Sequence, residues 1–289
     1  MKKYSILALI LLFLSCNKKE IKEYYGSGSL KSIRNVDKNG KTEGLYKEFY
    51  EDGQLKTVHK YRGDQKVDSS IYYYPEGKIK DIRYWNDSTN VQKKFSKTGQ
   101  LIGQGETKNN DLNFRIGSWK FSNGQNDSIV EYIAYNKKPY VNQFWTVSSK
   151  GDTLNSKSNY YRLIISDTVV LGEVARMRFF LRAPYYGEDS EVEVLLPFYD
   201  EDLNTDFSNI NEIEVDRFPS LKNDGIPHPE IPRGAPIDKI VEFGLTFDEI
   251  GEYKLRGSFV EYYFKNDSSQ RIERQLFFND KIYVVQKPK

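Results

Sequence analysis

Hydrophobic and polar residues alternate in short runs along residues 24–135, and a glycine-containing turn separates each run from the next. In the clearest unit, the strand-like runs 45–50 and 55–61 flank Asp52 and Gly53. An Asp-Gly step between such runs is a strong β-hairpin signal, because glycine tolerates a positive φ. The turn glycines recur every 22 to 25 residues, at Gly28, Gly53, Gly77, Gly99 and Gly124. This period predicts an array of one hairpin unit over residues 24–135, in which stacked neighbours bury a shared face.

The pattern changes after residue 135. We expect residues 136–158 to form a linker, because the repeat phase is lost there and turn residues surround Gly151. Val192 and Val194 then alternate with acidic residues, which is typical of a sheet with one wet face. Short strand-like runs over residues 159–289 predict an antiparallel β-sandwich. These runs are 160–166, 174–182, 191–198, 241–247, 252–264, 271–278 and 281–285.

Within this second region, residues 217–236 hold five prolines. Proline lacks the backbone N–H that a strand donates, so the segment is expected to be a loop. Loops of this length are often functional. A stiff crossover between two sheets is the alternative interpretation.

Glu249, Gly251, Tyr253 and Leu255 form a short motif late in the chain. It resembles the tyrosine corner of immunoglobulin-like (Ig-like) folds, in which a tyrosine tethers the entry to a strand. Leu255 stands where antibody domains carry a cysteine, so the resemblance implies a sandwich without a disulfide. The fold class expected for the whole chain is all-β, with a hairpin-repeat sheet followed by an antiparallel Ig-like β-sandwich.

The N-terminus has the features of an export signal. A basic start is followed by an apolar run that is too short to span a bilayer, and Ser15-Cys16 closes it. This ending resembles the lipobox of bacterial lipoprotein signal peptides, which implies cleavage between Ser15 and Cys16 and acylation of Cys16. Residues 1–15 would then be the signal peptide and residues 16–23 the acylated cysteine and a tether. A plain secretory signal with an incidental cysteine is the alternative.

The resemblance extends to the cellular location. The composition, rich in Asn, Lys, Tyr and Ile, is similar to that of Bacteroidota proteins. Lipoproteins of that group that reach the cell surface often carry an acidic patch after the cysteine, whereas Lys18 and Lys19 are basic. We therefore expect a lipid anchor in the outer membrane, facing the periplasm rather than the cell surface.

Two phrases of the repeat region, residues 44–53 and 115–124, each combine a leading glycine, aromatic residues and a turn glycine. They resemble the MORN-repeat variant of bacterial proteins described as antitoxin-like, over about residues 24–135. The resemblance implies an extended antiparallel sheet that serves as a scaffold or binding surface. It implies no reaction.

Charge and cysteine content restrict the partners. The net charge is +2, and removing residues 1–15 leaves 41 basic and 41 acidic residues, so no nucleic-acid partner is expected. The single cysteine excludes an intramolecular disulfide. The membrane, reached through the lipid anchor, and an unknown envelope protein or glycan are the expected partners.

No catalytic constellation is apparent. His59 and His228 are the only histidines, neither has metal-ligand spacing, and His59 is expected to pack within a strand. No complete phosphate or dinucleotide loop occurs. The oxygens of Asp200, Asp202, Asn204 and Asp206 weakly resemble the start of a calcium loop, although a solvated acidic loop fits them better. We expect no enzyme activity and no cofactor, while paired carboxylates for glycoside hydrolysis stay an open possibility.

The candidate binding residues are aromatic side chains of the repeats, for which stacking between units is the alternative role: Tyr46, Tyr50, Tyr72, Tyr74 and Trp85. The sequence favours a non-enzymatic, membrane-anchored lipoprotein that acts as an envelope scaffold or as a protein- or glycan-interaction module. A carbohydrate-binding or carbohydrate-degrading accessory lipoprotein and an antitoxin or immunity protein are the alternatives.

Overall fold

A computed structural model describes residues 19–165, 168–198, 201–229, 231–265 and 270–287. Ser15, Cys16 and the expected signal peptide lie outside these residues. The chain divides into two compact units, residues 1–100 and 101–289. Among the described residues, the only helical segments are the short 3₁₀ turns Asn155–Lys157 and Ile237–Lys239, so the all-β expectation is confirmed.

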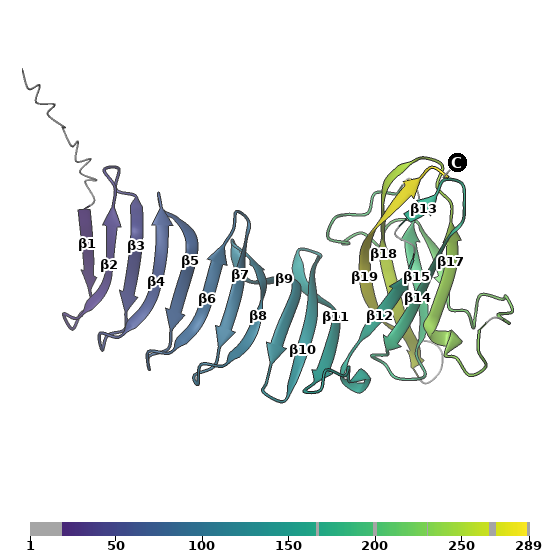
Figure 1. The fold of residues 1–289 in the computed structure, drawn as a ribbon, viewed down its shortest axis with the longest axis horizontal. Helices are drawn as coiled ribbons and strands as arrows, with labels where there is room; N and C mark the ends of the chain where they lie inside the picture. Colours follow the sequence, from purple (N-terminus) through teal and green to yellow (C-terminus); the bar gives the residue numbers. More distant parts are fainter. Residues whose placement is uncertain (1–18, 166–167, 199–200, 230, 266–269, 288–289) are drawn as a thin grey trace, which may run out of the picture. The chain divides into compact units, whose positions relative to one another are not determined.

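Unit 1 is an antiparallel meander in which each strand pairs with the next along the chain (Figure 1). The turns between consecutive strands are too short for a crossover connection, so neighbouring strands must be antiparallel. The strands are β1 (Lys19–Tyr24), β2 (Leu30–Val36), β3 (Thr42–Phe49), β4 (Leu55–Arg62), β5 (Gln65–Tyr73), β6 (Ile79–Trp85) and β7 (Thr89–Phe95).

A five-residue turn recurs between the strands of unit 1. The N–H of Gly53 donates to the carbonyl of Tyr50, and the N–H of Tyr50 donates to the carbonyl of Gln54. Gly53 has a φ of 85°, a conformation that a Cβ atom would strain. Equivalent turns carry Gly28, Gly77 and Gly99 with similar positive φ values. The glycine period in the sequence therefore marks one repeated turn geometry.

The two faces of the unit 1 sheet differ in chemistry. The cross-strand register from β3 to β7 places one row of polar and aromatic residues on one face: Tyr46, His59, Ser70, Arg83 and Gln92. The adjacent row lies on the opposite face: Lys47, Val58, Ile71, Ile82 and Lys93. Among the described residues of this unit, Val36 is the one buried hydrophobic side chain. Stacking and hydrogen bonds along the sheet must therefore supply much of its stability.

Unit 2 begins with a second meander made of β8 (Leu101–Lys108), β9 (Asp111–Ser122), β10 (Asn126–Tyr135) and β11 (Lys138–Ser148). Trp119 is fully buried, and its indole N–H donates to the carbonyl of Glu106 at 2.8 Å. Gly105 lies against the face of that ring, where an added Cβ would overlap it. The glycine thus makes room for the largest buried side chain of the meander.

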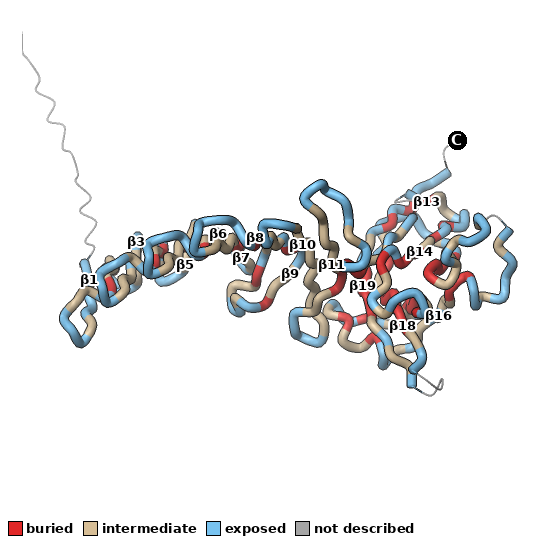
Figure 2. The backbone as a smooth tube through the Cα atoms, turned by 90° about the horizontal axis from the view of Figure 1, so that it is seen from below, coloured by how far each residue is buried: buried red, intermediate tan, exposed pale blue. Residues whose placement is uncertain are grey.

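Two further sheets of unit 2 face each other across a hydrophobic core (Figure 1). One has the order β12-β14-β17 and the other β13-β19-β18-β15-β16. Their strands are β12 (Tyr160–Ile164), β13 (Thr168–Val170), β14 (Ala175–Ala183), β15 (Glu191–Pro197), β16 (Val215–Pro219), β17 (Ile240–Leu245), β18 (Gly251–Lys265) and β19 (Gln270–Val285). Buried positions concentrate in these strands, whereas unit 1 has few (Figure 2).

The core between the two sheets is aromatic at its centre. The Phe179 ring stacks with Phe259 at 5.7 Å between centroids and contacts Phe278 at 4.9 Å. Phe179 comes from the three-stranded sheet, and the other two rings come from the five-stranded sheet. Such a core holds the two layers together without any disulfide.

Several elements differ from the sequence expectations. Residues 138–148, expected within a linker, form β11, which follows the tight turn at Asn136 and Lys137. The two expected strands 271–278 and 281–285 form one strand, β19, because Asn279 and Asp280 continue the pairing with β18. The short strands β13 and β16 were not expected.

The proline-rich segment and the tyrosine motif occupy defined places. The strand β16, which ends at Pro219, forms an edge of its sheet, where a missing N–H costs nothing. No strand occurs in the described residues from 220 to 236. The Tyr253 hydroxyl donates to the carbonyl of Glu249 at 3.1 Å, and Leu255 lies buried in the core.

Candidate functional site

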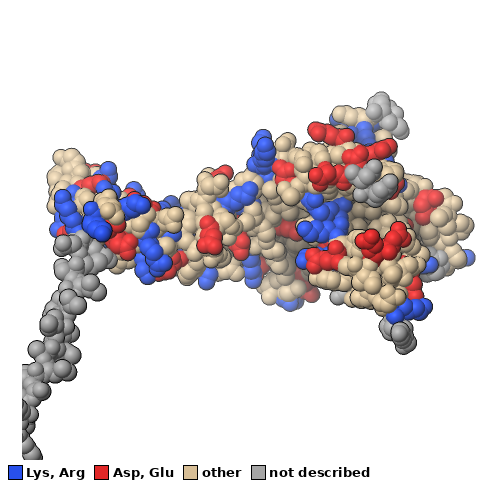
Figure 3. All heavy atoms as spheres, turned by 90° about the horizontal axis from the view of Figure 1, so that it is seen from above, with Lys and Arg blue, Asp and Glu red and all other residues tan. Residues whose placement is uncertain are grey.

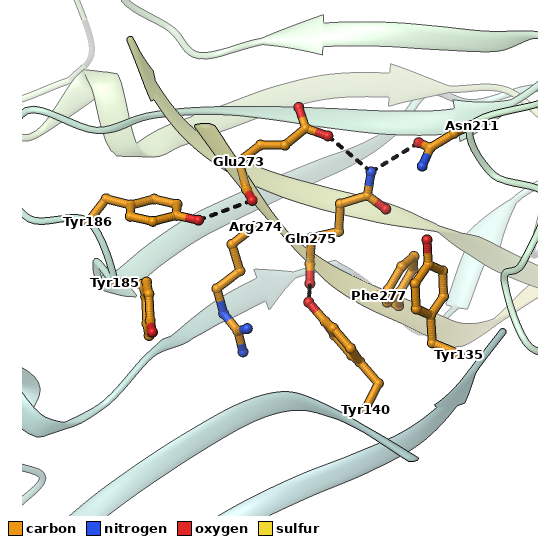
Figure 4. A pocket seen from close by; sticks show the side chains of 9 residues that line it. All are labelled: Tyr135, Tyr140, Tyr185, Tyr186, Asn211, Glu273, Arg274, Gln275 and Phe277. Atoms are coloured by element: carbon orange, nitrogen blue, oxygen red, sulfur yellow. Dashed lines mark hydrogen bonds between the residues drawn. The ribbon is translucent and has the colours of Figure 1, made fainter. Parts of the chain in front are cut away.

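Unit 2 contains a pocket of about 360 Å³ that is lined by four tyrosines, two of which face one arginine (Figure 4). We call it the tyrosine pocket. Its aromatic members are Tyr135, Tyr140, Tyr185, Tyr186 and Phe277, and its polar members are Asn211, Glu273, Arg274 and Gln275.

The tight turn between β10 and β11 places two of the tyrosines. Asn136 and Lys137 adopt φ values of 48° and 59°, so the chain reverses directly between Tyr135 and Tyr140. The Tyr140 hydroxyl donates to the Gln275 carbonyl at 2.7 Å. The Tyr135 ring stacks on Phe277 with centroids 4.9 Å apart. Both rings are therefore anchored on β19.

A buried carboxylate places the other two tyrosines. Glu261 is fully buried on β18 and accepts the backbone N–H groups of Tyr185 and Tyr186, each at 2.9 Å. The Ser190 hydroxyl donates to it at 2.9 Å and the Asn159 amide at 3.2 Å. A buried charge is tolerated when it collects this many donors. Glu261 thus fixes the backbone of the 185–186 loop in place.

Arg274 lies between the ring of Tyr140 and the ring of Tyr185, at 5.7 and 5.2 Å from their centroids (Figure 4). Its Nε donates to Asn159 Oδ1 at 2.7 Å, and one terminal nitrogen donates to the carbonyls of Val141 and Asn142. The guanidinium is therefore held rigidly, and its planar face can stack on a ligand or ring.

Tyr140 and Tyr186 act as neutral hydrogen-bonding groups at physiological pH. Burial raises the pKa of Tyr140, although Arg274 partly opposes this effect. Burial also raises the pKa of Tyr186, and the nearby Glu261 charge adds to the rise. The Tyr186 hydroxyl donates to the Glu273 carbonyl at 3.0 Å, whereas Tyr185 is 57% exposed. Tyr185 is accordingly the tyrosine most accessible to a partner.

The aromatic residues singled out from the repeats lie in unit 1 and are engaged within the sheet. Tyr46 and Tyr72 pack on either side of His59, with ring centroids 5.9 and 5.3 Å from it. Tyr50 and Tyr74 donate their hydroxyls to the carbonyls of Tyr73 and Phe95, respectively. Trp85 donates its indole N–H to the Ser70 hydroxyl at 2.7 Å. The structure brings Tyr46 and Tyr72 together around His59.

His59 is packed, as expected. It is 5% exposed, and burial lowers its pKa to about 4, with a smaller contribution from Lys66. Its Nδ1 has no hydrogen-bond partner among the described residues. His228 lies within 2.9 Å of the Asp224 carboxylate.

Three of the four calcium candidates, Asp202, Asn204 and Asp206, lie within the described residues. Asp200 lies outside the described residues, and Asp202 is exposed. Asp206 accepts the N–H of Lys137 at 3.0 Å and that of Ser208 at 3.3 Å, and these bonds, with that to the Ser208 side chain, lower its pKa. In the part of the chain that the structure describes, no group of three or more His, Cys, Asp or Glu side chains could hold a metal ion.

The residues of the tyrosine pocket were not found from the sequence. Tyr185-Tyr186 is a visible aromatic pair, but nothing local connects it with Tyr140 or Arg274. The hydrogen bond from Tyr140 joins residues 135 positions apart, and that from Arg274 to Asn159 joins residues 115 apart. Only contacts between strands of different sheets place them together.

The fold and the pocket define an all-β protein with a tyrosine-lined pocket in unit 2. No family model, curated protein or solved structure matches the chain. None of the described residues forms a helix of the length and hydrophobicity needed to cross a membrane.

Proposed function

We propose that this protein is a non-enzymatic binding protein of the bacterial envelope, held at a membrane through an acylated Cys16. In this proposal the tyrosine pocket holds a protein partner, and the repeat region acts as a scaffold. The observation that carries it is a pocket of about 360 Å³ lined by four tyrosines, in which Arg274 is held between the rings of Tyr140 and Tyr185. Tyrosine and arginine are enriched among the residues that dominate protein–protein binding energy.

The chemistry of the pocket favours binding over catalysis. The carboxylate of Glu273 pairs with Arg271 at 2.9 Å, which keeps it occupied as an ion pair rather than free as a base. Arg274 is committed to structural hydrogen bonds. These groups can offer a fixed surface to a partner, and rigid groups lose little entropy on binding.

Two architectural assignments belong to the same proposal. The repeated glycine turns and the phrases 44–53 and 115–124 support a MORN-like array. The hydrogen bond from Tyr253 to Glu249 and the buried Leu255 support an Ig-like relationship for the two-layered region. On the face seen in Figure 3, basic and acidic side chains are interspersed over unit 1, as suits a scaffold without a strong general attraction for nucleic acid.

Site-specific photocrosslinking in native cells tests the partner proposal. A photoreactive phenylalanine analogue at position 185 should capture one protein, and the same analogue at position 283 should not. Tyr283 is a suitable control because it is a tyrosine of similar exposure, 45%, and lies outside the pocket. The Tyr185→Ala variant should then lose most co-purification of the captured protein. Equal capture from both positions would show that the tyrosine pocket is not where the partner binds.

The anchor is tested separately. Cys16→Ala should move the protein from the membrane fraction to the soluble fraction, because one polypeptide without acyl chains has no stable hold on the bilayer. Protease treatment of intact cells then distinguishes the expected periplasmic face from the cell surface. Unchanged fractionation of the Cys16→Ala variant would refute lipidation.

A glycan is the second candidate for the pocket. The observation that favours it is the combination of flat tyrosine rings with the polar side chains of Asn211, Glu273 and Gln275, since small-ligand sites join apolar walls to a few placed hydrogen-bonding groups. Binding of purified envelope glycans that Tyr185→Ala abolishes and Tyr283→Ala preserves would select this candidate.

A further inference from the structure

A second cavity of unit 2, of about 470 Å³, holds two carboxylates within aromatic walls. We call it the acidic cavity. Glu131 on β10 and Asp280 on β19 both line it. The rings of Tyr132, Tyr161 and Phe207 line it as well. Its volume lies within the range of small-molecule sites, about 300–1,000 Å³.

Asp280 is placed where an apolar residue would be expected. It lies on the same face of β19 as Phe278 and Ile282, which are buried in the core between the two sheets. Its carboxylate is half-buried, and no donor lies within hydrogen-bond distance of it in the described part of the chain. Burial raises the pKa of Asp280, and the Glu131 charge adds to the rise. The fold therefore holds the Asp280 carboxylate at a position where its charged form is unfavourable.

Glu131 has a different environment. The side-chain amides of Asn142 and Gln143 donate to its Oε2 at 2.9 and 3.0 Å. These bonds fix the carboxylate in position. The cavity thus has one fixed carboxylate and one uncompensated carboxylate.

No basic residue compensates the pair from the cavity wall. None of the described residues that line it is Lys, Arg or His. The nearby Arg115 donates to the Tyr132 hydroxyl at 2.9 Å, and Arg256 donates to the carbonyls of Leu203 and Asn204. The negative charge inside the cavity is therefore available to a ligand.

The aromatic walls of the acidic cavity favour an organic cation over a metal ion. Aromatic faces attract organic cations through their quadrupole, and the attraction strengthens when water is displaced. Two carboxylates are fewer ligands than a calcium ion takes, which is six to eight oxygens. A positively charged nitrogen on an apolar stem satisfies both the charge and the ring surfaces.

We propose that the acidic cavity binds a primary ammonium group carried on an apolar stem, with Glu131 and Asp280 as its counter-ions. This site is separate from the tyrosine pocket and does not depend on the function proposed for it. Binding replaces the repulsion between the two carboxylates by two attractions, so the ligand relieves an existing strain.

Calorimetric titration of the full chain at pH 8 and low ionic strength, with n-pentylamine and 1-pentanol as matched probes, tests the proposal. The amine should bind saturably, and 1-pentanol should bind at least about tenfold more weakly. Asp280→Asn and Glu131→Gln should each weaken amine binding by a similar factor, while Asp216→Asn, an exposed acid on β16, should not. Tyr185→Ala should also leave amine binding intact, which separates this site from the tyrosine pocket.

NMR of ¹³C-labelled tyrosine identifies where the amine binds. Shifts of the Tyr132 and Tyr161 signals that saturate with n-pentylamine, and that disappear in Asp280→Asn, are the expected result. Equal binding of the amine and the alcohol, or unchanged amine binding in Asp280→Asn, would overturn the proposal. So would calcium chloride at micromolar concentration displacing the amine, because it would make the cavity a metal site.

Discussion

The hydroxyl of Tyr50 donates a 2.7 Å hydrogen bond to the backbone carbonyl of Tyr73, the residue that precedes the next turn. Tyr25 makes the same bond to Phe49, and Tyr74 makes it to Phe95. The three tyrosines stand at the first position of equivalent glycine turns, so each bond ties one turn to the next repeat. Ser96 takes this position in the following turn and has no phenol to continue the series.

Tyr50→Phe should therefore weaken unit 1 locally. Losing one such hydrogen bond costs about 1 kcal/mol. We expect native-state amide exchange in β4 and β5 to be faster in the variant, because local opening of these strands becomes easier by this free energy. Tyr73→Phe is the matched control, because the Tyr73 hydroxyl makes no hydrogen bond within the described residues. Equal exchange in the two variants would show that the bond contributes nothing.

His59 should make unit 1 sensitive to mild acid. Its pKa is about 4 in the folded protein, against an ordinary value of 6.5. A group whose pKa is lowered by folding contributes stability above the ordinary value, and this is lost as pH falls through the folded value. Between pH 7 and pH 4, unit 1 should lose about 2–3 kcal/mol. His59→Phe should remove this pH dependence, and NMR titration giving a midpoint near 6.5 would contradict the assignment.

Glu261→Ala should destabilise unit 2 strongly. The substitution removes an acceptor shared by four donors, those of Tyr185, Tyr186, Ser190 and Asn159. A hydrogen bond to a charged group contributes about 1.5–3 kcal/mol, so losing these bonds together should cost several kcal/mol. Urea unfolding followed by tryptophan fluorescence measures the change, with the exposed Glu249→Ala as the control. A loss below about 1 kcal/mol would mean that water replaces the carboxylate.

Asp280→Asn, in contrast to Glu261→Ala, should stabilise unit 2. A carboxyl group with a raised pKa contributes stability at low pH, and this is lost as pH rises through the raised value. Removing the charge should then stabilise unit 2 at pH 7 by about 0.5–1 kcal/mol, a figure reduced for partial solvent screening. Thermal unfolding at pH 7 measures it, with Asp216→Asn as the control. A lower melting temperature in Asp280→Asn would show that Asp280 has a stabilising partner.

Local patterns predicted the hairpins of unit 1 well. The expected runs 45–50 and 55–61 correspond to β3 (Thr42–Phe49) and β4 (Leu55–Arg62), since alternation and a glycine turn act over a few residues. The same reasoning failed at β11, where a turn without glycine begins a strand. It also divided β19 in two, because Asn279 and Asp280 resemble a turn unless their pairing with β18 is known.

The candidate sites show the limit of local patterns more sharply. The aromatic residues of the repeats were visible because they recur. The hydroxyls of Tyr50 and Tyr74, however, donate hydrogen bonds to backbone carbonyls within the sheet. The acidic run near Asp206 was visible because its residues are adjacent, yet Asp206 caps backbone groups. Glu131 and Asp280, in contrast, are isolated acids in the sequence and become a pair only when β10 and β19 line one cavity.

The sequence by itself determined the all-β class, the hairpin period and the packed state of His59, because alternation, turn chemistry and burial preference act at short range. The expected acylation of Cys16 also comes from the sequence alone and stays a prediction. Tertiary structure alone decided the tyrosine pocket and the acidic cavity. Both depend on contacts between strands of different sheets that lie more than 100 residues apart in the sequence, and only the packing of the whole unit brings such strands together.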